Sequence, residues 1–406
     1  MRSLFCFMLA TLLLSTTLSA QEAAQWRGQH RDGVYTETGL LRSWPALGPK
    51  LLWHNDSIGE GHASASVVSH DLVYTAGLRG GKGHVFAFTL DGKLVWDTPY
   101  GDEWSENFPG TRSTPLIHEG KVYLMSAFGK IVCLSADKGN LLWSADLMKE
   151  YDGRNIVWGV TENLLIDGDK LFITLGGTKN NVIALHKDTG KLIWSSEGNG
   201  EVSAYGSPLL ITLPARKVLI TMTEKSILGL DAATGKKLWS HEQINQWAVH
   251  ANTPVYSNGM LYCVSGYGCG GVMLKLSADG SSIETAWNNA DLDSRMGGVV
   301  LVNDKIYGMG DKVKGLHCID WNTGKELAFD KFNNKFGSII AADGMLYVYD
   351  ESGEVALVEP TLDGFKKVSG FKVPFGSAQH WAHPVIDNGR LYIRHGNSLM
   401  VYDIRK

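Results

Sequence analysis

A repeat runs along nearly the whole chain, and it limits the chain to very few architectures. One recurring unit is a short polar turn followed by apolar residues and usually a tyrosine, as in residues 119–123 (EGKVY) and 388–392 (NGRLY). Eight copies occur at spacings of 40 to 49 residues, and their anchor residues are Tyr74, Tyr123, Phe172, Leu219, Tyr262, Tyr307, Tyr347 and Tyr392. Asn-Gly and Asp-Gly pairs supply the positive φ of tight hairpin turns, while Val, Leu, Ile and Tyr favour strands. The repeat therefore predicts eight units made of short antiparallel strands.

A second unit follows each of the first four anchors by 20 to 22 residues and ends in a tryptophan. Residues 137–143 (DKGNLLW) and 188–194 (DTGKLIW) are two examples, and looser copies occur at Trp287 and at residues 322–327 (NTGKEL). Each period thus holds about four strands, too few to bury their own faces. Such units stack around an axis as the blades of a β-propeller. A β-sandwich with coincidental turn spacing does not account for eight regular periods.

The two ends of the chain predict how the ring closes. Tyr392 lies 14 residues before the C-terminus, which leaves no room for the tryptophan-bearing outer strand of the eighth unit. Residues 49–53 (PKLLW) form a copy of that outer strand ahead of the first anchor. We therefore expect an all-β, eight-bladed propeller of four-stranded antiparallel blades over residues 45–406. Its N-terminal strand should complete the C-terminal blade and so remove an exposed sheet edge.

The first twenty residues have the pattern of a signal peptide. Arg2 precedes an apolar run, Leu4 to Leu14, and the small residues Ser19 and Ala20 offer a cleavage site. A retained membrane anchor is the alternative, but the run is too short, and no other stretch approaches the roughly 20 apolar residues of a membrane span. We expect residues 1–20 to be removed, residues 21–44 to form an N-terminal extension, and the product to be periplasmic or extracellular without a transmembrane anchor.

Charge and cysteine content exclude several classes of protein. The chain has 38 Lys+Arg and 42 Asp+Glu, a net charge of -4, so it lacks the basic excess of a general nucleic-acid-binding protein. Cys133, Cys263, Cys269 and Cys318 remain after the signal segment, with no adjacent pair and no CxxC spacing. A bridge between Cys263 and Cys269 and two free thiols are both open alternatives.

The turn D-x-x-T-G-K-x-x-W, seen in full at residues 231–239 (DAATGKKLW), resembles the tryptophan-docking repeat of the PQQ-like, or quinoprotein-type, β-propellers. Residues 26–33 (WRGQHRDG) also resemble the opening motif of exported bacterial PQQ-binding-like repeat proteins. The resemblance covers residues 45–406 and implies that each tryptophan packs between neighbouring blades. The family includes alcohol dehydrogenases that bind PQQ and calcium in the funnel, and also non-catalytic scaffolds such as the lipoprotein of the outer-membrane barrel-assembly machinery. It therefore implies a fold rather than an activity.

The chain departs from both kinds of relative. The enzymes commonly carry adjacent cysteines that stack on the quinone, and they are longer. This sequence has no such pair and no CxxCH haem motif. It also lacks a lipobox cysteine ahead of the expected mature start.

Candidate ligand-binding residues come from the segments before the anchors, where the innermost strands should line a central channel. Residues at equal distances upstream of the anchors should form a ring there, and their neighbours add aromatic side chains. The candidates are His62, Arg112, Trp158, Glu162, Asn163, Tyr205, Trp247, His250, Asn252, Arg295, Lys335, Gln379, His380 and Trp381. Aromatic rings with arginine and asparagine suit a planar or sugar-like ligand. The alternative is that these side chains bond to one another in a water-filled channel.

Two kinds of cofactor are compatible with these residues. His62, His380 and His383 could hold a divalent transition metal, provided the loop bends, because residues three apart on a strand face opposite ways. For PQQ with calcium, Glu162 and Asn163 are the candidate calcium ligands, with Arg112 or Arg295 near the quinone oxygens. No residue can be assigned as a catalytic base.

Three functions follow as hypotheses. The first is an exported binding or accessory scaffold that takes a glycan, another small molecule or a cell-envelope protein in its central funnel. The second is a PQQ-dependent alcohol or sugar dehydrogenase. The third is a metal-assisted carbohydrate lyase or hydrolase.

Overall fold

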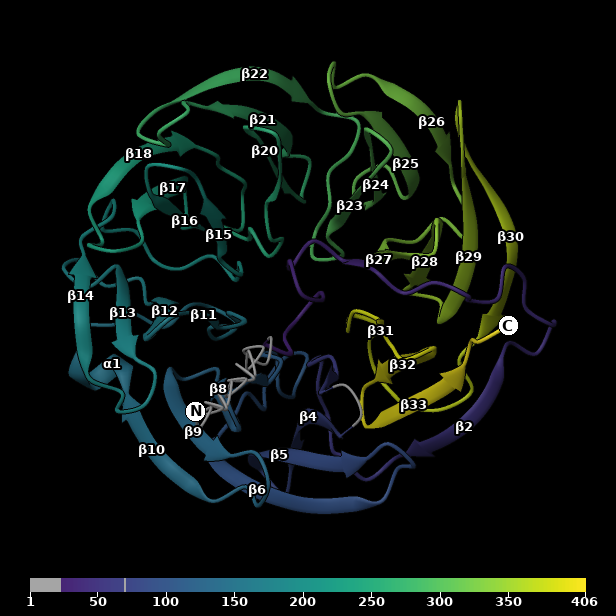
Figure 1. Ribbon diagram of the computed structural model, residues 1–406, viewed down its shortest axis with the longest axis horizontal. Helices are drawn as coiled ribbons and strands as arrows, with labels where there is room; N and C mark the ends of the chain where they lie inside the picture. Colours follow the sequence, from purple (N-terminus) through teal and green to yellow (C-terminus); the bar gives the residue numbers. More distant parts are fainter. Residues whose placement is uncertain (1–22, 69–70) are drawn as a thin grey trace, which may run out of the picture.

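Eight β-sheets stand around a common axis, as Figure 1 shows for the computed structural model, which describes residues 23–68 and 71–406. The predicted signal segment, residues 1–20, lies outside the described residues. In six of the eight sheets the strand nearest the axis comes first in the chain order, and successive strands pair antiparallel outward. The prediction of an eight-bladed propeller with four-stranded antiparallel blades is confirmed.

The first four blades follow one another along the chain. Blade I contains β3 (Ser66–Val67), β4 (Leu72–Arg79), β5 (Lys82–Thr89) and β6 (Leu94–Asp102). Blade II contains β7 (Leu116–His118), β8 (Lys121–Met125), β9 (Lys130–Ser135) and β10 (Leu141–Asp146), and the short helix α1 (Leu147–Glu150) follows it. Blade III contains β11 (Leu165–Asp167), β12 (Lys170–Thr174), β13 (Val182–His186) and β14 (Leu192–Ser196). Blade IV contains β15 (Leu209–Thr212), β16 (Lys217–Met222), β17 (Ser226–Asp231) and β18 (Lys237–Glu242).

The other four blades complete the ring. Blade V contains β19 (Val255–Ser257), β20 (Met260–Ser265), β21 (Gly270–Leu276) and β22 (Ile283–Asn289). Blade VI contains β23 (Val299–Val302), β24 (Lys305–Gly310), β25 (Gly315–Asp320) and β26 (Glu326–Asp330). Blade VII contains β27 (Gly337–Ala342), β28 (Met345–Asp350), β29 (Glu354–Thr361) and β30 (Gly364–Lys372). Blade VIII contains β31 (Val385–Asp387), β32 (Arg390–His395), β33 (Ser398–Asp403) and β2 (Lys50–Asn55).

The ring closes where the sequence predicted. Strand β2 pairs antiparallel with β33, and Trp53 lies opposite Val401. The Trp53 indole N–H also donates to the Leu90 carbonyl of blade I at 3.0 Å. The closing strand therefore joins blade VIII by its backbone and contacts blade I by its side chain, so the ring has no open junction at this point.

The repeated tryptophan and the repeated glycine make one contact between neighbouring blades. Trp96 of blade I donates to the Ala136 carbonyl in a turn of blade II at 2.9 Å. Gly139 in that turn has φ +67°, and a Cβ there would lie 2.5 Å from the Trp96 ring. Glycine is therefore required both for the turn and for the close approach of the ring. Trp143, Trp194 and Trp239 donate to the following blade in the same way.

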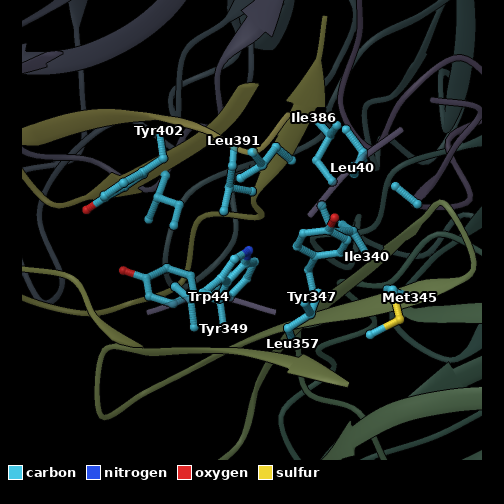
Figure 2. Close-up of a cluster of buried hydrophobic side chains, with 14 of the residues drawn as sticks. Leu40, Trp44, Ile340, Met345, Tyr347, Tyr349, Leu357, Ile386, Leu391 and Tyr402 are labelled. Atoms are coloured by element: carbon cyan, nitrogen blue, oxygen red, sulfur yellow. The ribbon is translucent and has the colours of Figure 1, made fainter. Parts of the chain in front are cut away.

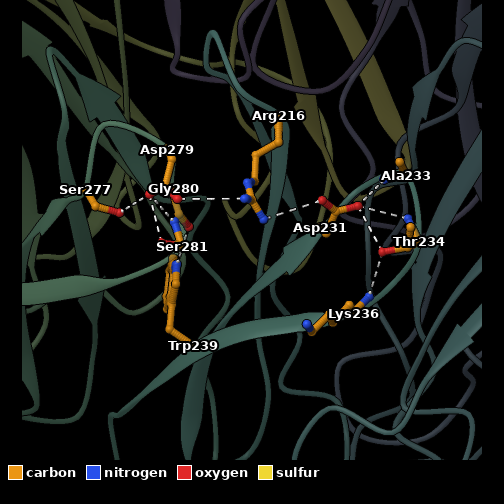
Figure 3. A network of polar contacts seen from close by, with 10 residues as sticks. All are labelled: Arg216, Asp231, Ala233, Thr234, Lys236, Trp239, Ser277, Asp279, Gly280 and Ser281. Atoms are coloured by element: carbon orange, nitrogen blue, oxygen red, sulfur yellow. Dashed lines mark hydrogen bonds and ion pairs between the residues drawn. The ribbon is translucent and has the colours of Figure 1, made fainter.

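Figure 3 shows this contact between blades IV and V, where Trp239 reaches the carbonyl of Gly280 at 3.2 Å. Asp231 begins the D-x-x-T turn, and its carboxylate accepts from the backbone N–H and the hydroxyl of Thr234, each at 3.0 Å. Arg216 lies between Asp231 and Asp279, at 3.8 and 3.7 Å. The polar residues of the repeated motif therefore stabilise the turn that the tryptophan of the preceding blade contacts.

Residues 23–49, named here the N-terminal strap, cross the middle of the ring before they reach β2 (Figure 1). Strand β1 (Val34–Tyr35) in the strap pairs parallel with β27 and gives blade VII a fifth strand. Trp44 then packs between blades VII and VIII, with its ring 5.7 Å from that of Tyr347 and 5.4 Å from that of Phe371. Figure 2 shows Trp44 among Tyr349, Tyr402 and neighbouring apolar side chains. The sequence did not predict this course for the segment.

All four described cysteines are free thiols, and the bridge considered between Cys263 and Cys269 is not formed. Within residues 23–68 and 71–406, no helix combines the length and apolar character needed to cross a membrane.

Candidate functional site

A cavity of about 200 Å³ lies in the funnel at one end of the axis. Its wall comes from the loops that lead into the innermost strands, from the β20–β21 turn and from the strap. The residues that line it are Trp26, His62, Phe108, Arg112, Trp158, Thr161, Asn163, Tyr205, Val249, Ala251, Tyr267, Arg295, Met296, Trp381 and His383. Seven blades contribute residues to this lining in addition to the strap.

The strap closes the inner end of this cavity. Trp26 is buried, and its ring stands edge-on against His383 with 4.9 Å between the ring centroids. Two further cavities, of about 510 and 420 Å³, are lined by Gln25, Gln29 and His30 and share no residue with the funnel cavity. The strap therefore separates the funnel from these cavities, and Trp26 forms its floor.

Two buried arginines hold the strap in place. The Arg27 guanidinium bonds to blades VI, VII and VIII and to the strap itself, through the carbonyls of Gly297, Val299, Ile339 and Asp32 and the Nδ1 of His383. Arg31 instead contacts the segment that leads into blade III, where it donates to the carbonyls of Asn163 and Leu164 at 2.7 and 2.9 Å. Both residues have left-handed backbone, with φ of 62° and 59°. Strained backbone of this kind persists only where the surroundings fix it strongly.

Aromatic rings form two groups on the funnel. Trp158 lies 5.9 Å from Tyr205 and 6.2 Å from Trp247, with the rings tilted by 45° and 58°. Elsewhere on the funnel, Trp381 lies 4.9 Å from Phe108 and 4.8 Å from His62, tilted by 47° and 41°. Because the rings are tilted, each wall offers separate aromatic faces rather than a parallel slot.

Two arginines supply the positive charge of the cavity wall. Arg112 donates to the carbonyls of Gly110 and Phe108 at 2.7 and 3.0 Å and lies over the Trp104 ring. Burial lowers the pKa of Arg112 to about 10, so the side chain remains charged at neutral pH. Arg295 instead pairs with Asp311 at 2.6 Å. Of the described residues that line the cavity, none is acidic.

The two histidines of the wall are neutral at physiological pH. Burial, reinforced by the charges of Arg112 and Arg394, lowers the pKa of His62 to about 3. Burial and the charge of Arg27 lower the pKa of His383 to about 3 as well. His62 can therefore offer a hydrogen bond to a ligand, whereas both ring nitrogens of His383 are engaged by the protein. Neither ring adds charge to the funnel.

The three histidines proposed as metal ligands are not brought together. Both nitrogens of His383 are engaged, with Arg27 at 3.0 Å and with the Met296 carbonyl at 2.9 Å. His380 bonds to the Tyr349 hydroxyl at 2.5 Å and stacks on His395. Over residues 23–68 and 71–406, no group of three or more His, Cys, Asp or Glu side chains is placed to hold a metal ion. The prediction of a site made by His62, His380 and His383 is therefore wrong.

The oxygen donors predicted for calcium also have other roles. Glu162 lies behind the wall, where its Oε2 accepts from the Thr174 N–H at 2.8 Å. The Asn163 side-chain oxygen accepts from the Thr114 N–H at 2.7 Å, and its amide donates to Ser207 at 2.9 Å. Because calcium needs six to eight oxygen ligands, usually including carboxylates, these residues do not fit a quinone held by calcium.

Eight of the predicted residues line the cavity: His62, Arg112, Trp158, Asn163, Tyr205, Arg295, Trp381 and His383. The other predicted residues do not: Glu162, Trp247, His250, Asn252, Lys335, Gln379 and His380. They do not line it because the segments before the anchors are loops ahead of the innermost strands, and an equal distance from the anchor does not fix which loop side chains face the cavity. For example, β19 begins at Val255, five residues after His250. Strand periodicity does not apply in those loops.

Two of the misplaced residues brace the blades instead. His250 is buried, with its Nδ1 2.6 Å from the Ser265 hydroxyl and its Nε2 3.2 Å from the Glu224 carbonyl. The Asn252 amide donates to the carbonyls of Ser294 and Val264. Trp247, Lys335, Gln379 and His380 are at least partly exposed, and Trp247 contacts the wall residue Trp158.

The residues that sequence reasoning missed are Trp26, Phe108, Thr161, Val249, Ala251, Tyr267 and Met296. Trp26 was marked only by the opening motif, which gave no indication of its place in space. Phe108, Tyr205 and Tyr267 all have left-handed backbone, with φ of 58°, 66° and 59°. This conformation is uncommon outside glycine and often occurs at functional sites. For aromatic residues, no sequence pattern indicates this backbone conformation.

Comparison with known proteins supports the family that the repeat suggests. The sequence profile of the family described as "Outer membrane protein assembly factor BamB" matches residues 37–146 and 81–328. A quinoprotein ethanol dehydrogenase of Pseudomonas putida is 30% identical over 120 residues, which cover 29% of this chain and 18% of that protein. An outer membrane protein assembly factor BamB of Kangiella koreensis is 28% identical over 140 residues, covering 33% of this chain and 32% of that protein. The matched segments thus span less than a third of either curated relative.

Solved structures of the same two kinds share the fold. The crystal structure of BamB from Moraxella catarrhalis has a TM-score of 0.62 at 16% identity and covers 86% of this chain and 98% of its own. The quinohemoprotein alcohol dehydrogenase ADHIIG of Pseudomonas putida has a TM-score of 0.64 at 12% identity, covering 95% and 80%. Together with the repeated tryptophan contact, these matches show that the chain belongs to the PQQ-like repeat propellers, the family whose profile carries the BamB description.

Proposed function

We propose that this protein is an exported accessory protein of the cell envelope that binds a glycan in its funnel. The observation that carries the proposal is the cavity floored by Trp26, with tilted aromatic faces beside hydrogen-bonding side chains. The apolar face of a sugar ring packs on a single aromatic face, while its hydroxyls need donors and acceptors nearby. His62 and Thr161 are such polar groups on this wall.

The shape of the funnel favours a glycan end over a folded protein partner. A protein interface usually needs a broad surface of roughly 800 Å² on each partner, whereas this cavity is small and closed at its inner end by the strap. Export is proposed because residues 1–20 have the pattern of a signal peptide. A place in the envelope is consistent with the name of the matched family, which refers to outer membrane protein assembly.

The experiment is a calorimetric titration of the purified protein with neutral and acidic oligosaccharides of four sugar units. We expect saturable binding, and a Trp158→Ala variant should bind roughly tenfold more weakly, because one aromatic face is lost. Phe329→Ala is the matched control: it removes a half-exposed ring on the outer strand of blade VI and should leave the affinity unchanged.

The alternative hypothesis, a PQQ-dependent dehydrogenase, is tested by a separate measurement on the same purified protein. PQQ with calcium is added to the protein, and dye reduction is followed over alcohols and sugars. Absence of saturable oligosaccharide binding would contradict the proposal, and PQQ-dependent dye reduction would replace it with the enzyme.

A further inference from the structure

The charge of the funnel wall is one-sided. The whole chain has a net charge of -4, yet the cavity is lined by Arg112 and Arg295, with no carboxylate among the described residues that line it. A planar guanidinium that lines a partly buried cavity is well suited to bind a carboxylate or another anion. The described residues that line the cavity therefore carry positive charge and no negative charge.

Arg112 is the arginine that lacks this partner. Two of its N–H groups go to the carbonyls of Gly110 and Phe108, which fix the guanidinium in place. Within the described residues, Arg112 is not among the arginines that form an ion pair with a carboxylate. The acidic side chain that influences it most is Glu103, which is buried and already accepts from the Tyr100 hydroxyl and from two backbone N–H groups.

Arg295 provides the contrast within the same wall. Its guanidinium pairs with Asp311 at 2.6 Å and lies between the rings of Tyr267 and Phe336, at 4.8 and 4.7 Å from their centroids. That side chain is neutralised and held by the protein itself. Arg112, in contrast, is held by two neutral carbonyls and the face of the Trp104 ring, and it lines the same cavity as Trp381 and Phe108.

We propose that the glycan bound in the funnel is acidic, and that a carboxylate on one of its sugars pairs with the Arg112 guanidinium while a ring packs on the aromatic wall. This inference rests on the proposed function and adds the chemical class of the ligand. Arginine suits the role because its planar donors match the two oxygens of a carboxylate. A neutral sugar would leave the charge of Arg112 unpaired in a partly desolvated site.

The test compares tetragalacturonate with its fully methyl-esterified form, in which the sugar rings stay the same while each carboxylate loses its charge and gains a methyl group. The acid should bind roughly 10- to 100-fold more tightly than the ester, the range expected for a charge-assisted hydrogen-bonded pair. Raising the NaCl concentration from 50 to 500 mM should weaken binding of the acid and leave the ester unaffected.

Substitutions test whether Arg112 is the residue that pairs with the carboxylate of the glycan. Arg112→Gln should reduce the affinity for the acid to that of the ester, and Arg112→Lys should restore part of it. Arg405→Gln, which removes an exposed positive charge near the C-terminus, should have no effect. Thermal unfolding of each variant checks that it is folded, and the acid–ester comparison in the unaltered protein needs no variant.

Equal affinities for the acid and the ester would overturn this inference and leave the proposed glycan binding intact. An acid preference that Arg112→Gln does not reduce would also overturn it. If neither the acid nor the ester binds, and the neutral oligosaccharides do not bind either, both this inference and the proposed glycan binding are contradicted.

Discussion

Replacing Arg27 with alanine is expected to lower the free energy of unfolding by about 3 to 5 kcal/mol, the cost of removing one side of a buried charged network. Arg27 is fully buried, and its partners belong to three blades that lie far from it in the sequence. Burial lowers its pKa to about 10, so it is charged at neutral pH, and its hydrogen bonds offset the cost of desolvation. Alanine would leave several buried acceptors and the Nδ1 of His383 without this donor.

Urea unfolding followed by tryptophan fluorescence measures this change, and limited proteolysis shows whether residues 23–49 are released. Arg27→Lys keeps the charge but not the planar set of donors, so it should lie between the alanine variant and the unaltered protein. Arg405→Gln is the control at an exposed arginine and should leave the unfolding midpoint unchanged. A stability of Arg27→Ala within 1 kcal/mol of the unaltered protein, with an uncut strap, would contradict the role given to the strap.

Glu162 should make the protein less stable as the pH rises. Burial raises the pKa of this carboxyl from 4.5 to about 7, because only one of its oxygens accepts a hydrogen bond and Arg31 acts on it from a distance. Below pH 4.5 the group is protonated in both the folded and unfolded states. Between pH 4.5 and 7 it ionises only in the unfolded chain, so stability falls across this window. The loss above pH 7 is about 3 kcal/mol, from roughly 1.4 kcal/mol for each pKa unit.

Glu162→Gln keeps the shape but cannot ionise. We expect this variant to be more stable than the unaltered protein at pH 8 and similar to it at pH 4.5. Other titrating groups, such as Glu351 with a pKa raised to about 7 by burial, contribute equally to both proteins and cancel in the difference. Urea unfolding at four pH values measures the effect. A difference between the two proteins that does not change with pH would show that Glu162 is not held protonated by its surroundings.

The sequence predicted the propeller because its information is local and repeated. Each turn carries its own glycine and polar residue, and each tryptophan contacts an equivalent turn in the next blade, as Trp96 does at Gly139. Eight repetitions make this pattern unmistakable. The closure by Trp53 followed from counting strands, since one end of the chain lacked the strand that the other end had in excess.

The strap and much of the funnel could not be predicted in this way. Arg27 bonds to backbone carbonyls as far away as Ile339, 312 residues along the chain, and carbonyls carry no sequence signal. The funnel loops have neither strand nor helix periodicity, so equal distances from the anchors placed His250 on the wall although it bonds to residues of blades IV and V instead. Tyr267 was missed because it lies in a turn after its anchor rather than before it.

The central claim, that the funnel is a binding site for an acidic glycan, is tested most directly by a crystal structure of the protein soaked with tetragalacturonate. The account predicts one sugar ring over Trp26 or Trp158 and its carboxylate at the guanidinium of Arg112. A sugar found only outside the funnel, for example in the cavity between the strap and blades I and VIII, would contradict it. So would a ring in the funnel whose carboxylate points away from Arg112.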